Sequence, residues 1–354
     1  MLEKSVIING RAINSESPPY IVAEISGNHG GHLSRGIELI NQAKYAGADA
    51  VKIQSYTPDS ITIDHDSPEF ILKDGLWHGQ TLYNLYASAH TPREWHKPLF
   101  DHARRIGITI FSSPFDKDAI NLLETLDTPA YKIASPEIVD FDLIEACAET
   151  GKPLIISTGM ASIEEIDEAV NVAKGAGARN VLLLHCISAY PTPIEQANLN
   201  TINDLSLRFN ASIGLSDHTN GSLAATLAVA QGAVLIEKHI TLSKSNGAVD
   251  NAFSIEPKEL KQLVIDTKTA HLAMGKPTYS PTKNESLMLI ARRSLYAISD
   301  IGAGETFTSE NIRSIRPNLG LHPRFYKTIL GKSAPINIKR GTPLNLSMID
   351  DIEE

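Results

Sequence analysis

The sequence contains little cysteine, no long apolar run and no excess of positive charge. Cys147 and Cys186 are the only cysteines among the 354 residues, and both lie in apolar surroundings typical of small core residues. A chain without a disulfide framework fits a reducing compartment. No segment approaches the roughly 18 apolar residues of a membrane span, and the N-terminus lacks an apolar signal segment. The net charge of −9 disfavours general binding to nucleic acid or acidic membranes. We therefore expect a cytoplasmic protein with no nucleic-acid or membrane partner.

What the sequence does contain is a regular rhythm of short apolar runs and helical patterns. After a small predicted hairpin at 5–13, eight runs rich in Ile and Val, such as 181–186, each precede a segment with helical periodicity, ending near residue 274. Continuous apolar runs are typical of parallel strands that are buried on both faces. Eight such units predict an α/β fold of the (β/α)8 TIM-barrel type, with an open doubly wound sheet as the alternative.

The composition changes after the last helical pattern. Residues 1–275 are predicted to form the barrel domain, and the Pro-punctuated segment 276–290 is predicted to be a linker. Residues 291–354 have short β patterns and Gly turns, and residues 300–312 resemble residues 337–349 at a spacing of 37. The sequence therefore predicts a small, pseudo-symmetric β-rich domain that packs on a barrel, its own or a partner's.

Two histidines stand at the ends of consecutive predicted strands. The stretches Gly214-Leu-Ser-Asp-His-Thr219 and Ile236-Glu-Lys-His239 each end an apolar run with a histidine. In a parallel barrel, His218 and His239 would emerge side by side at the rim where barrel active sites lie. Two imidazoles at that rim suit a divalent metal. The alternative is that each is a hydrogen-bonded structural residue, which is common for a histidine at a strand end.

Two lysines, Lys52 and Lys132, lie within otherwise apolar predicted strands. They would point into or above the barrel mouth, where a cation needs an anionic partner. Hydroxyl-rich turns follow other strands, and with Lys132 they could form a phosphate cradle. These turns are Ser112-Ser113, Ser157-Thr158-Gly159 and Leu215-Ser216. Each serine taken alone fits an ordinary helix N-cap equally well.

The second strand-to-helix connection, from residue 56 to about residue 90, is far longer than the usual two to six residues or so. It carries Trp77, Tyr83 and Tyr86. On the active face of a barrel such a segment is a lid or a specificity loop; the alternative is a small decorative subdomain.

Taken together, several stretches carry a family resemblance that covers nearly the whole chain. The chain resembles the sialic acid synthase (nonulosonic acid synthase) family. The matching stretches are Ala23-Glu-Ile-Ser-Gly-Asn-His29, Val51-Lys-Ile-Gln54, Phe111-Ser-Ser-Pro-Phe-Asp116, Tyr131-Lys-Ile-Ala-Ser135, Ile156-Ser-Thr-Gly-Met160 and Cys186-Ile-Ser-Ala-Tyr-Pro191, besides the two histidine stretches. Ser314-Ile-Arg-Pro317 resembles the antifreeze-like (SAF) domain of this family.

Within the family, the chain is most similar to the pseudaminic acid synthase branch. The similarity lies in Gly75-Leu-Trp-His-Gly79, Leu82-Tyr-Asn-Leu-Tyr86 and Thr91-Pro-Arg-Glu-Trp-His96. Two stretches depart from the family's usual pattern. Ser26-Gly-Asn-His-Gly30 replaces Ser-Ala-Asn-His-Asn, and Gly247-Ala-Val-Asp250 replaces Gly-Gly-Val-Asp.

The resemblance implies a condensation of phosphoenolpyruvate with the open-chain aldehyde of an acetamido hexose and water. Phosphate would leave by C–O cleavage. For the pseudaminic acid branch, the sugar is a 2,4-diacetamido-2,4,6-trideoxy hexose and the product is pseudaminic acid. A divalent metal on His218 and His239 would polarise the aldehyde, and two neutral imidazoles favour Mn²⁺ over Mg²⁺.

The resemblance also implies a role for each candidate site residue. Phosphoenolpyruvate contacts fall on Lys132, Ser113, Ser135, Ser157, Ser188 and Ser216. Sugar contacts fall on Lys52, Gln54, Tyr190 and Asp250, with Arg316 of the C-terminal domain reaching the partner's active site across a homodimer. Glu137 would deprotonate the attacking water, and Glu24 is the second candidate for this role.

Other functions fit parts of the same pattern. The same chemistry could act on N-acetylmannosamine or on the legionaminic acid precursor. A metal-dependent barrel aldolase without phosphoenolpyruvate would not need Lys132 or the serine cradle. A carbohydrate- or ice-binding protein built on the small β domain would leave the ionisable residues at the strand ends without a use.

Overall fold

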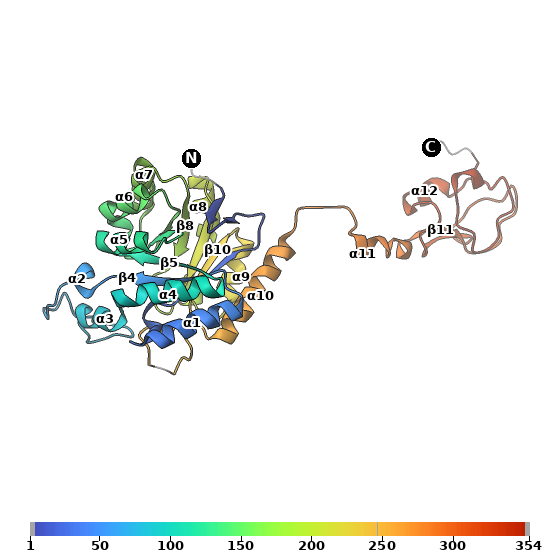
Figure 1. Cartoon of the computed structure of the whole chain (residues 1–354). Coiled ribbons are helices and arrows are strands. Elements are labelled where there is room, and N and C mark those ends of the chain that lie inside the picture. Colours follow the sequence, from blue (N-terminus) through green and yellow to red (C-terminus); the bar gives the residue numbers. More distant parts are fainter. Residues whose placement is uncertain (1–3, 246, 351–354) are drawn as a thin grey trace. The chain divides into compact units, whose positions relative to one another are not determined.

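The first part of the chain is built on eight parallel strands that close on themselves. The computed structural model describes residues 4–245 and 247–350, so 1–3 and 351–354 of the two predicted domains lie outside the described residues. By its contacts the chain divides into two compact units, Met1–Gly275 and Lys276–Glu354. In the first unit the strands pair in the order β10-β3-β4-β5-β6-β7-β8-β9, and β10 pairs with β3 (Figure 1). The predicted barrel is confirmed, and the alternative of an open sheet is wrong.

The eight strands that form the barrel wall are each three to six residues long. They are β3 (Tyr20–Glu24), β4 (Ala50–Ser55), β5 (Thr109–Pro114), β6 (Tyr131–Ile133), β7 (Leu154–Ser157), β8 (Val181–Cys186), β9 (Ile213–Asp217) and β10 (Leu235–His239). Nearly all their residues are buried, since one face meets the barrel interior and the other meets the helices. This double burial explains why the sequence shows continuous apolar runs rather than alternation.

Helices surround the barrel (Figure 1). Their apolar side chains belong to the same core cluster as those of the strands. They are α1 (Leu33–Ala46), α4 (Arg93–Ile106), α5 (Lys117–Thr125), α6 (Phe141–Glu149), α7 (Ile163–Gly175), α8 (Asn200–Phe209), α9 (Leu223–Ala230) and α10 (Pro257–Met274). Local signals fix their ends. Ser162 and Glu165 form a capping box at the start of α7. α1 ends at Gly47, whose φ of 91° favours glycine.

Inside the barrel, rows of side chains change from apolar to polar along each strand. Residues two apart on a strand face the same side, so Val22 precedes Glu24 and Ala50 precedes Lys52. The apolar ends form one cluster with the N-terminal hairpin of β1 (Val6–Ile8) and β2 (Arg11–Ile13). That cluster comprises Val6, Ile8, Ile13, Tyr20, Val22, Ala50, Phe111, Ala130, Ile155, Leu182, Leu184, Val234 and Leu235. The hairpin therefore plugs the N-terminal end of the barrel.

The long connection after β4 is partly ordered by its own secondary structure. It contains α2 (Pro58–Ile61) and α3 (Leu82–Ala89), and Ile71 pairs with Thr81 in an antiparallel bridge. The short 3-10 helices η1 (Ser26–His29), η2 (Ser135–Val139) and η3 (Ile194–Gln196) follow β3, β6 and β8. Several predicted site residues lie on or beside η1 and η2.

The second unit is a small β-rich domain with a core of its own. Its elements are α11 (Lys283–Ser286), η4 (Leu289–Ala291), β11 (Ser294–Ala297), β12 (Ile312–Ile315), η5 (Pro323–Phe325), α12 (Tyr326–Ile329) and η6 (Leu346–Met348). The segment predicted to be a linker, 276–290, holds the short helix α11. Aliphatic residues and Phe307 fill the core, which explains how about 60 residues can fold with little apolar area.

The faint sequence repeat of the second unit corresponds to a two-fold relation in its backbone. Ile301 and Ile338, 37 residues apart, exchange two hydrogen bonds of 2.8 Å each. Other bonds repeat with the same offset: Gly304 N donates to Ala334 O at 2.7 Å, and Gly341 N donates to Ala297 O at 2.8 Å. Each half of the domain thus completes the pairing of the other, as the repeat predicted.

Candidate active site

The barrel gathers fourteen of the fifteen predicted site residues at the C-terminal ends of its strands. Those on strands are Glu24, Lys52, Gln54, Ser113, Lys132, Ser157, Ser216 and His239, and those in the segments that follow strands are Ser135, Glu137, Ser188, Tyr190, His218 and Asp250. Arg316, the fifteenth, follows β12 in the second unit. Its role across a dimer stays a prediction.

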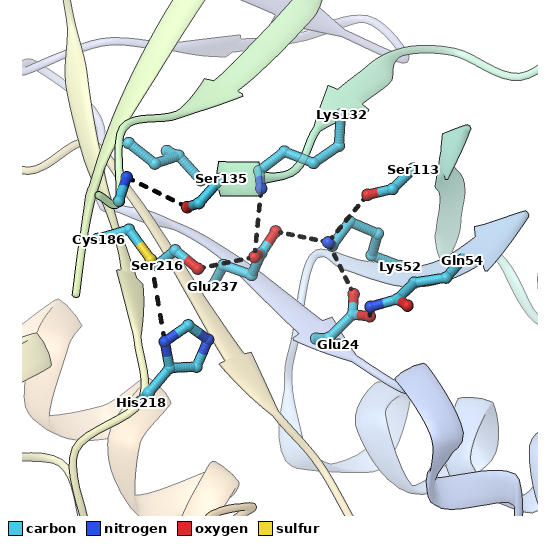
Figure 2. Close-up of polar contacts among 12 residues, drawn as sticks. Glu24, Lys52, Gln54, Ser113, Lys132, Ser135, Cys186, Ser216, His218 and Glu237 are labelled. Carbon is cyan, nitrogen blue, oxygen red and sulfur yellow. Dashed lines mark hydrogen bonds and ion pairs between the residues drawn. The ribbon is translucent and has the colours of Figure 1, made fainter. Parts of the chain in front are cut away.

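A buried ionic network crosses the barrel mouth (Figure 2). Nζ of Lys52 lies 3.1 Å from a carboxylate oxygen of Glu24 and 3.4 Å from one of Glu237. Glu237 also lies 3.7 Å from Nζ of Lys132 and accepts a 2.9 Å hydrogen bond from Oγ of Ser216. These residues come from β3, β4, β6, β9 and β10, which are not all neighbours in the sheet. The contacts are therefore possible only inside the barrel.

The network pushes the pKa values of its two carboxyl groups apart. Burial and the nearby charge of Glu237 raise the pKa of Glu24 to about 7, with Lys52 only partly offsetting this. Burial also opposes ionisation of Glu237, but Lys132 and Lys52 outweigh it and bring the pKa of Glu237 to about 2. Glu237 is therefore ionised at neutral pH, whereas Glu24 exchanges a proton there. Two neighbouring carboxyl groups whose pKa values are pushed apart, one toward the protonated and one toward the ionised form, are typical of acid–base sites.

The lysines and serines leave hydroxyl and ammonium donors directed at one space. Lys52 donates to Oγ of Ser113 at 3.2 Å. Burial lowers the pKa of Lys132, and repulsion from Lys52 adds to this, against the attraction of Glu237. No described residue hydrogen-bonds the buried Oγ of Ser157. Donors without protein acceptors in a buried site suit an incoming anion.

Close backbone approach shapes the wall between two of these serines. Gly159 N donates to Oγ of Ser135 at 3.1 Å. A Cβ at position 159 would lie 2.4 Å from Oγ of Ser188 and 2.7 Å from Oγ of Ser135. Any larger residue would displace both serine hydroxyls, which explains glycine in the Ser157-Thr158-Gly159 turn better than an ordinary helix cap does.

The two histidines lie side by side, as their strand order predicted. Their ring centroids are 5.3 Å apart. Nδ1 of His218 lies 3.0 Å from the carbonyl oxygen of Ile187, so Nδ1 carries the proton and Nε2 keeps a lone pair. Nδ1 of His239 is buried and accepts or donates no hydrogen bond within the described residues. Burial and the charge of His218 hold the pKa of His239 well below its usual value.

This arrangement fits a divalent cation, with two protein ligands rather than a full set. A neutral imidazole whose buried nitrogen has no hydrogen-bond partner is available to bind a metal ion. Among residues 4–245 and 247–350, no group of three or more His, Cys, Asp or Glu could hold a metal by itself. A cation bound by His218 and His239 would therefore take its other ligands from water or substrate.

Glu137 lies on η2 at the edge of the same space. The residue is half-buried, and its Oε2 has no hydrogen-bond partner in the part of the chain that the structure describes. Burial raises the pKa of Glu137 to about 7, although its own backbone N–H and Lys132 oppose the shift. The group can therefore gain or lose a proton near neutral pH, as a general base requires.

An aromatic cluster stands on the other side of the histidine pair. Tyr190 packs on His218 with ring centroids 4.5 Å apart, and Phe253 packs on His239 at 4.9 Å. Trp77, from the long connection after β4, lies 5.9 Å from Tyr190 and 6.4 Å from Phe253. Nε1 of Trp77 donates to Val249 O at 3.2 Å. The long connection therefore reaches this side of the site through the indole of Trp77.

Asp250 ties the loop after β10 to η1. Its Oδ2 accepts a 3.1 Å hydrogen bond from Gly27 N, and burial raises its pKa despite the bonds from Ser26 and Gly27. A Cβ at position 27 would lie 3.1 Å from Cβ of Ala89 and 3.2 Å from Cβ of Val249. A larger side chain at position 27 would therefore crowd Ala89 and Val249, and the glycine of the Ser-Gly-Asn-His variant avoids this contact.

Two residues, Glu237 and Cys186, correct the sequence-based interpretation. Glu237 was not among the predicted catalytic or binding residues, yet it links both site lysines; its spacing of two from His239 was the available signal. Cys147 is a core residue as expected. Cys186 is more than that, because its sulfur lies 3.9 Å from Nδ1 of His218. Burial opposes the thiolate, but His218 lowers the pKa of Cys186 to about 7. Lys238 faces away from the mouth.

Comparison with known proteins agrees with this geometry. Residues 39–279 match the NeuB family, and residues 292–350 match the SAF domain. A pseudaminic acid synthase of Helicobacter pylori is 46% identical over 95% of this chain and 98% of that protein. One of Campylobacter jejuni is 45% identical over 94% and 97%. An N,N'-diacetyllegionaminic acid synthase of Campylobacter jejuni is 36% identical over 90% and 96%.

A solved structure shares the fold. The N-acetylneuraminic acid synthetase of Leptospira borgpetersenii, in complex with citrate, superposes with a TM-score of 0.73 at 32% identity, over 81% of this chain and 96% of that one. The resemblance to sialic acid synthases, and to their pseudaminic acid branch, is confirmed by these relatives. The chain belongs to the NeuB family.

Proposed function

We propose that the protein condenses phosphoenolpyruvate with a 2,4-diacetamido-2,4,6-trideoxy hexose and water to give pseudaminic acid and phosphate. The observation that carries the proposal is the buried Lys52–Glu237–Lys132 network, which lies beside the paired rings of His218 and His239. Support for the sugar comes from the pseudaminic acid synthases, which are 44–46% identical. The legionaminic acid synthases, at 34–36%, are less similar.

Phosphoenolpyruvate is a multiply charged anion, and the mouth can accept it. Lys52 and Lys132 face one firmly ionised carboxylate, Glu237, while Glu24, with a pKa of about 7, is ionised only in part at neutral pH. The site therefore keeps positive charge for the anion's phosphate and carboxylate. Hydroxyl donors then complete its binding, and the proposed ones are Ser113, Ser135, Ser157, Ser188 and Ser216.

The histidine pair is proposed to hold the divalent metal, with Mn²⁺ favoured over Mg²⁺ because nitrogen ligands suit it better. When bound, the cation supplies Lewis acidity toward the aldehyde oxygen of the sugar. The chain's own part is to orient the imidazoles and to set their protonation. Burial lowers the pKa of His239, whereas for His218 burial is outweighed by Cys186, which raises the pKa; the hydrogen bond to Ile187 O orients the ring of His218.

The carboxyl groups move the protons of the reaction. C3 of phosphoenolpyruvate bonds to the aldehyde carbon, whose oxygen takes a proton, and the oxygen of water bonds to C2. The tetrahedral product then loses phosphate by cleavage of the bond between C2 and the phosphate oxygen. The C2 hydroxyl gives its proton to the leaving phosphate as the C2 carbonyl forms, which leaves the keto acid. Glu137 is the proposed acceptor of the water proton because one of its oxygens is uncommitted. Glu24 is the alternative, although an ion pair to Lys52 already engages it.

Lys52, Gln54, Tyr190 and Asp250 are proposed to contact the sugar, and Arg316 is proposed to complete the site from the second protomer of a homodimer. The two units of one chain are separate compact bodies, so a residue of the second unit can serve another chain's barrel. A mixing experiment tests this. His218→Ala and Arg316→Ala proteins, each inactive alone, should regain activity when mixed, because one hybrid site is intact. No recovery in mixed dimers would reject the exchange.

One assay tests the reaction itself. The full chain is supplied with phosphoenolpyruvate, Mn²⁺ and one acetamido sugar at a time, and phosphate release is measured. We expect the greatest kcat/KM with the 2,4-diacetamido-2,4,6-trideoxy hexose that leads to pseudaminic acid. A preference for the legionaminic acid precursor or N-acetylmannosamine would replace the proposed sugar. Release of phosphate with none of them would reject the synthase, and turnover without phosphoenolpyruvate would favour an aldolase.

A further inference from the structure

A fully buried ion pair lies directly behind the two histidines. On β10, Glu237 and His239 face the barrel mouth, so Lys238 between them faces the opposite side. Its Nζ lies 2.7 Å from Oδ2 of Asp217, and the two side chains are 0% and 1% exposed. Asp217 immediately precedes His218. The pair therefore joins the chain neighbour of one histidine to the chain neighbour of the other.

The same ammonium also holds the residue that follows His218. Nζ of Lys238 donates to Thr219 O, and the other oxygen of Asp217 accepts a 2.8 Å bond from Thr219 N. Residues 217 and 219 are thus both bound by one charged group. The cluster therefore restrains the backbone on both sides of His218, while the hydrogen bonds to Ile187 O and from Thr192 N hold the residue itself.

The cluster begins where the strand pairing ends. β9 and β10 are paired at Leu215 with Ile236, at Ser216 with Glu237, and at Asp217 with Lys238. His218 and His239 come one residue later and have no ladder partner on each other's strand. His239 is fixed by its pairing with β3. Between β9 and β10, the ion pair takes over from the backbone ladder at the point where the relative position of the two rings is decided.

A buried ion pair is a costly way to stabilise a fold. Removing two charges from water costs several kcal/mol for each ion, and well-packed apolar residues often serve stability equally well. The pair makes three directional contacts in a place where an apolar pair would make none. Directional contacts fix position, and an error of about 1 Å in a ligand is enough to weaken a designed site.

We propose that Asp217 and Lys238 are positioning residues that fix the spacing of His218 and His239 and thereby set the affinity of the histidine pair for a divalent cation. The inference rests on the metal role in the proposed function. Both side chains are fully buried, and Lys238 faces away from the barrel mouth. Their effect is carried through the backbone of residues 217–219 and through the register of β10.

Cation affinity can be measured without turnover. Mn²⁺ is titrated into the full-length protein without substrates, and free Mn²⁺ is followed by electron paramagnetic resonance; thermal unfolding is measured on the same samples. Lys238→Met and Asp217→Asn should weaken Mn²⁺ binding about 10- to 100-fold, the usual effect of losing a residue that orients a metal ligand. The double variant Asp217→Leu/Lys238→Met should regain stability but not Mn²⁺ affinity.

The opposite end of the barrel offers a matched control. Asp49 also joins a cation, Arg11, to a backbone N–H, that of Ile21, at 2.8 Å, but it is far along the strands from the histidines. Asp49→Asn should lower the unfolding temperature and leave Mn²⁺ affinity unchanged. Equal loss of affinity in this control would overturn the proposal, because the effect would then follow stability alone.

Two further outcomes decide the case. If Lys238→Met does not fold, Lys238→Arg keeps the charge but changes its reach, and it should fold and bind Mn²⁺ more weakly. Double-variant protein that binds Mn²⁺ as the unaltered chain does would reject the positioning role. If unaltered protein also released phosphate in the sugar assay, only the inference would fail. Weakened binding together with no turnover on any sugar would instead reject the proposed function and keep the inference.

Discussion

The two ends of the barrel are built from the same strands, yet they bury opposite kinds of side chain. At the N-terminal end, Val22, Ala50 and Phe111 pack on the hairpin in an apolar cluster. Two residues further along the same rows lie Glu24, Lys52 and Ser113, which form the ionic network. Burial at the first end releases apolar surface from water, whereas burial at the second must be offset by mutual pairing. One end holds the barrel together and the other is available for chemistry.

The largest effect should follow from removing a histidine. His218→Ala or His239→Ala should lower kcat by more than about a thousandfold, since a Lewis acid contributes several kcal/mol to the transition state. The fold should persist, because the rings contribute little to the apolar cluster. Phosphate release and circular dichroism measure the two consequences. Full activity of the unaltered protein in excess chelator would contradict the metal role.

The reverse effect should appear two residues below the network. Phe111→Ala removes a fully buried ring from the plug and should lower the free energy of unfolding by about 3–5 kcal/mol. The molecules that remain folded should keep most of their kcat, because the ring of Phe111 belongs to the apolar cluster, although its backbone pairs with that of Lys52. Urea unfolding and a kcat corrected for folded fraction separate the two. A lower kcat at unchanged stability would contradict the assignment of stability to one end of the barrel and of chemistry to the other.

A pH profile should report the carboxyl group that serves as base. With a pKa of about 7, Glu137 must lose its proton to act, so kcat should rise with pH and level off above about 7. Glu137→Gln should lower kcat and abolish this rise. Persistence of the same acidic limb in the variant would assign it to another group, with Glu24 the next candidate.

Glu137 should also make the free energy of unfolding depend on pH. Its pKa in the folded protein lies above the ordinary 4.5, so between pH 4.5 and about 7 the native state keeps a proton that the unfolded chain has lost. The contribution of Glu137 to the free energy of unfolding therefore falls as pH rises through that window. Glu137→Gln should flatten this part of the stability curve. An unchanged curve would mean that the carboxyl is more solvated than its position suggests.

The smallest effect is expected at the rim of the mouth. Trp77→Ala removes the indole that packs on Tyr190 and Phe253, and such aromatic contacts contribute about 0.5–1.5 kcal/mol each. KM for the sugar should rise about three- to tenfold, while KM for phosphoenolpyruvate stays the same. Trp77→Phe should recover most of the loss. An equal rise in both KM values would assign Trp77 to general closure rather than to sugar specificity.

The barrel could be predicted from the sequence because its physics is local and repeated. Doubly buried strands give continuous apolar runs, and each helix between them keeps its own period. Once the strand order is known, His218 and His239 must be neighbours, and the inward rows place Glu24, Lys52 and Lys132 at one rim. These features depend on periodicity and chain order alone.

The remaining features depend on which side of a strand faces the mouth and on contacts across the barrel. Glu237 and Lys238 are adjacent charges in an apolar strand, and alternation says only that they face opposite sides. The register of β10 with β3 and β9 decides that Glu237 faces inward. The low pKa of the Cys186 thiol likewise depends on His218, 32 residues away. Arg316 lies in another compact unit, so its partner stays a prediction.

The plugged end of the barrel has a consequence for how the protein is made. The N-terminal strands cannot complete their pairing as soon as they are synthesised. β3 pairs with β10, and Lys4 O accepts a hydrogen bond from Ser212, 208 residues later. The opening hairpin must wait, with Val6 and Ile8 uncovered, until the eighth strand has been synthesised. Contacts this distant in sequence slow folding. Until β10 is available, the apolar side chains of the hairpin lack Val234 and Leu235, which complete their cluster in the folded protein.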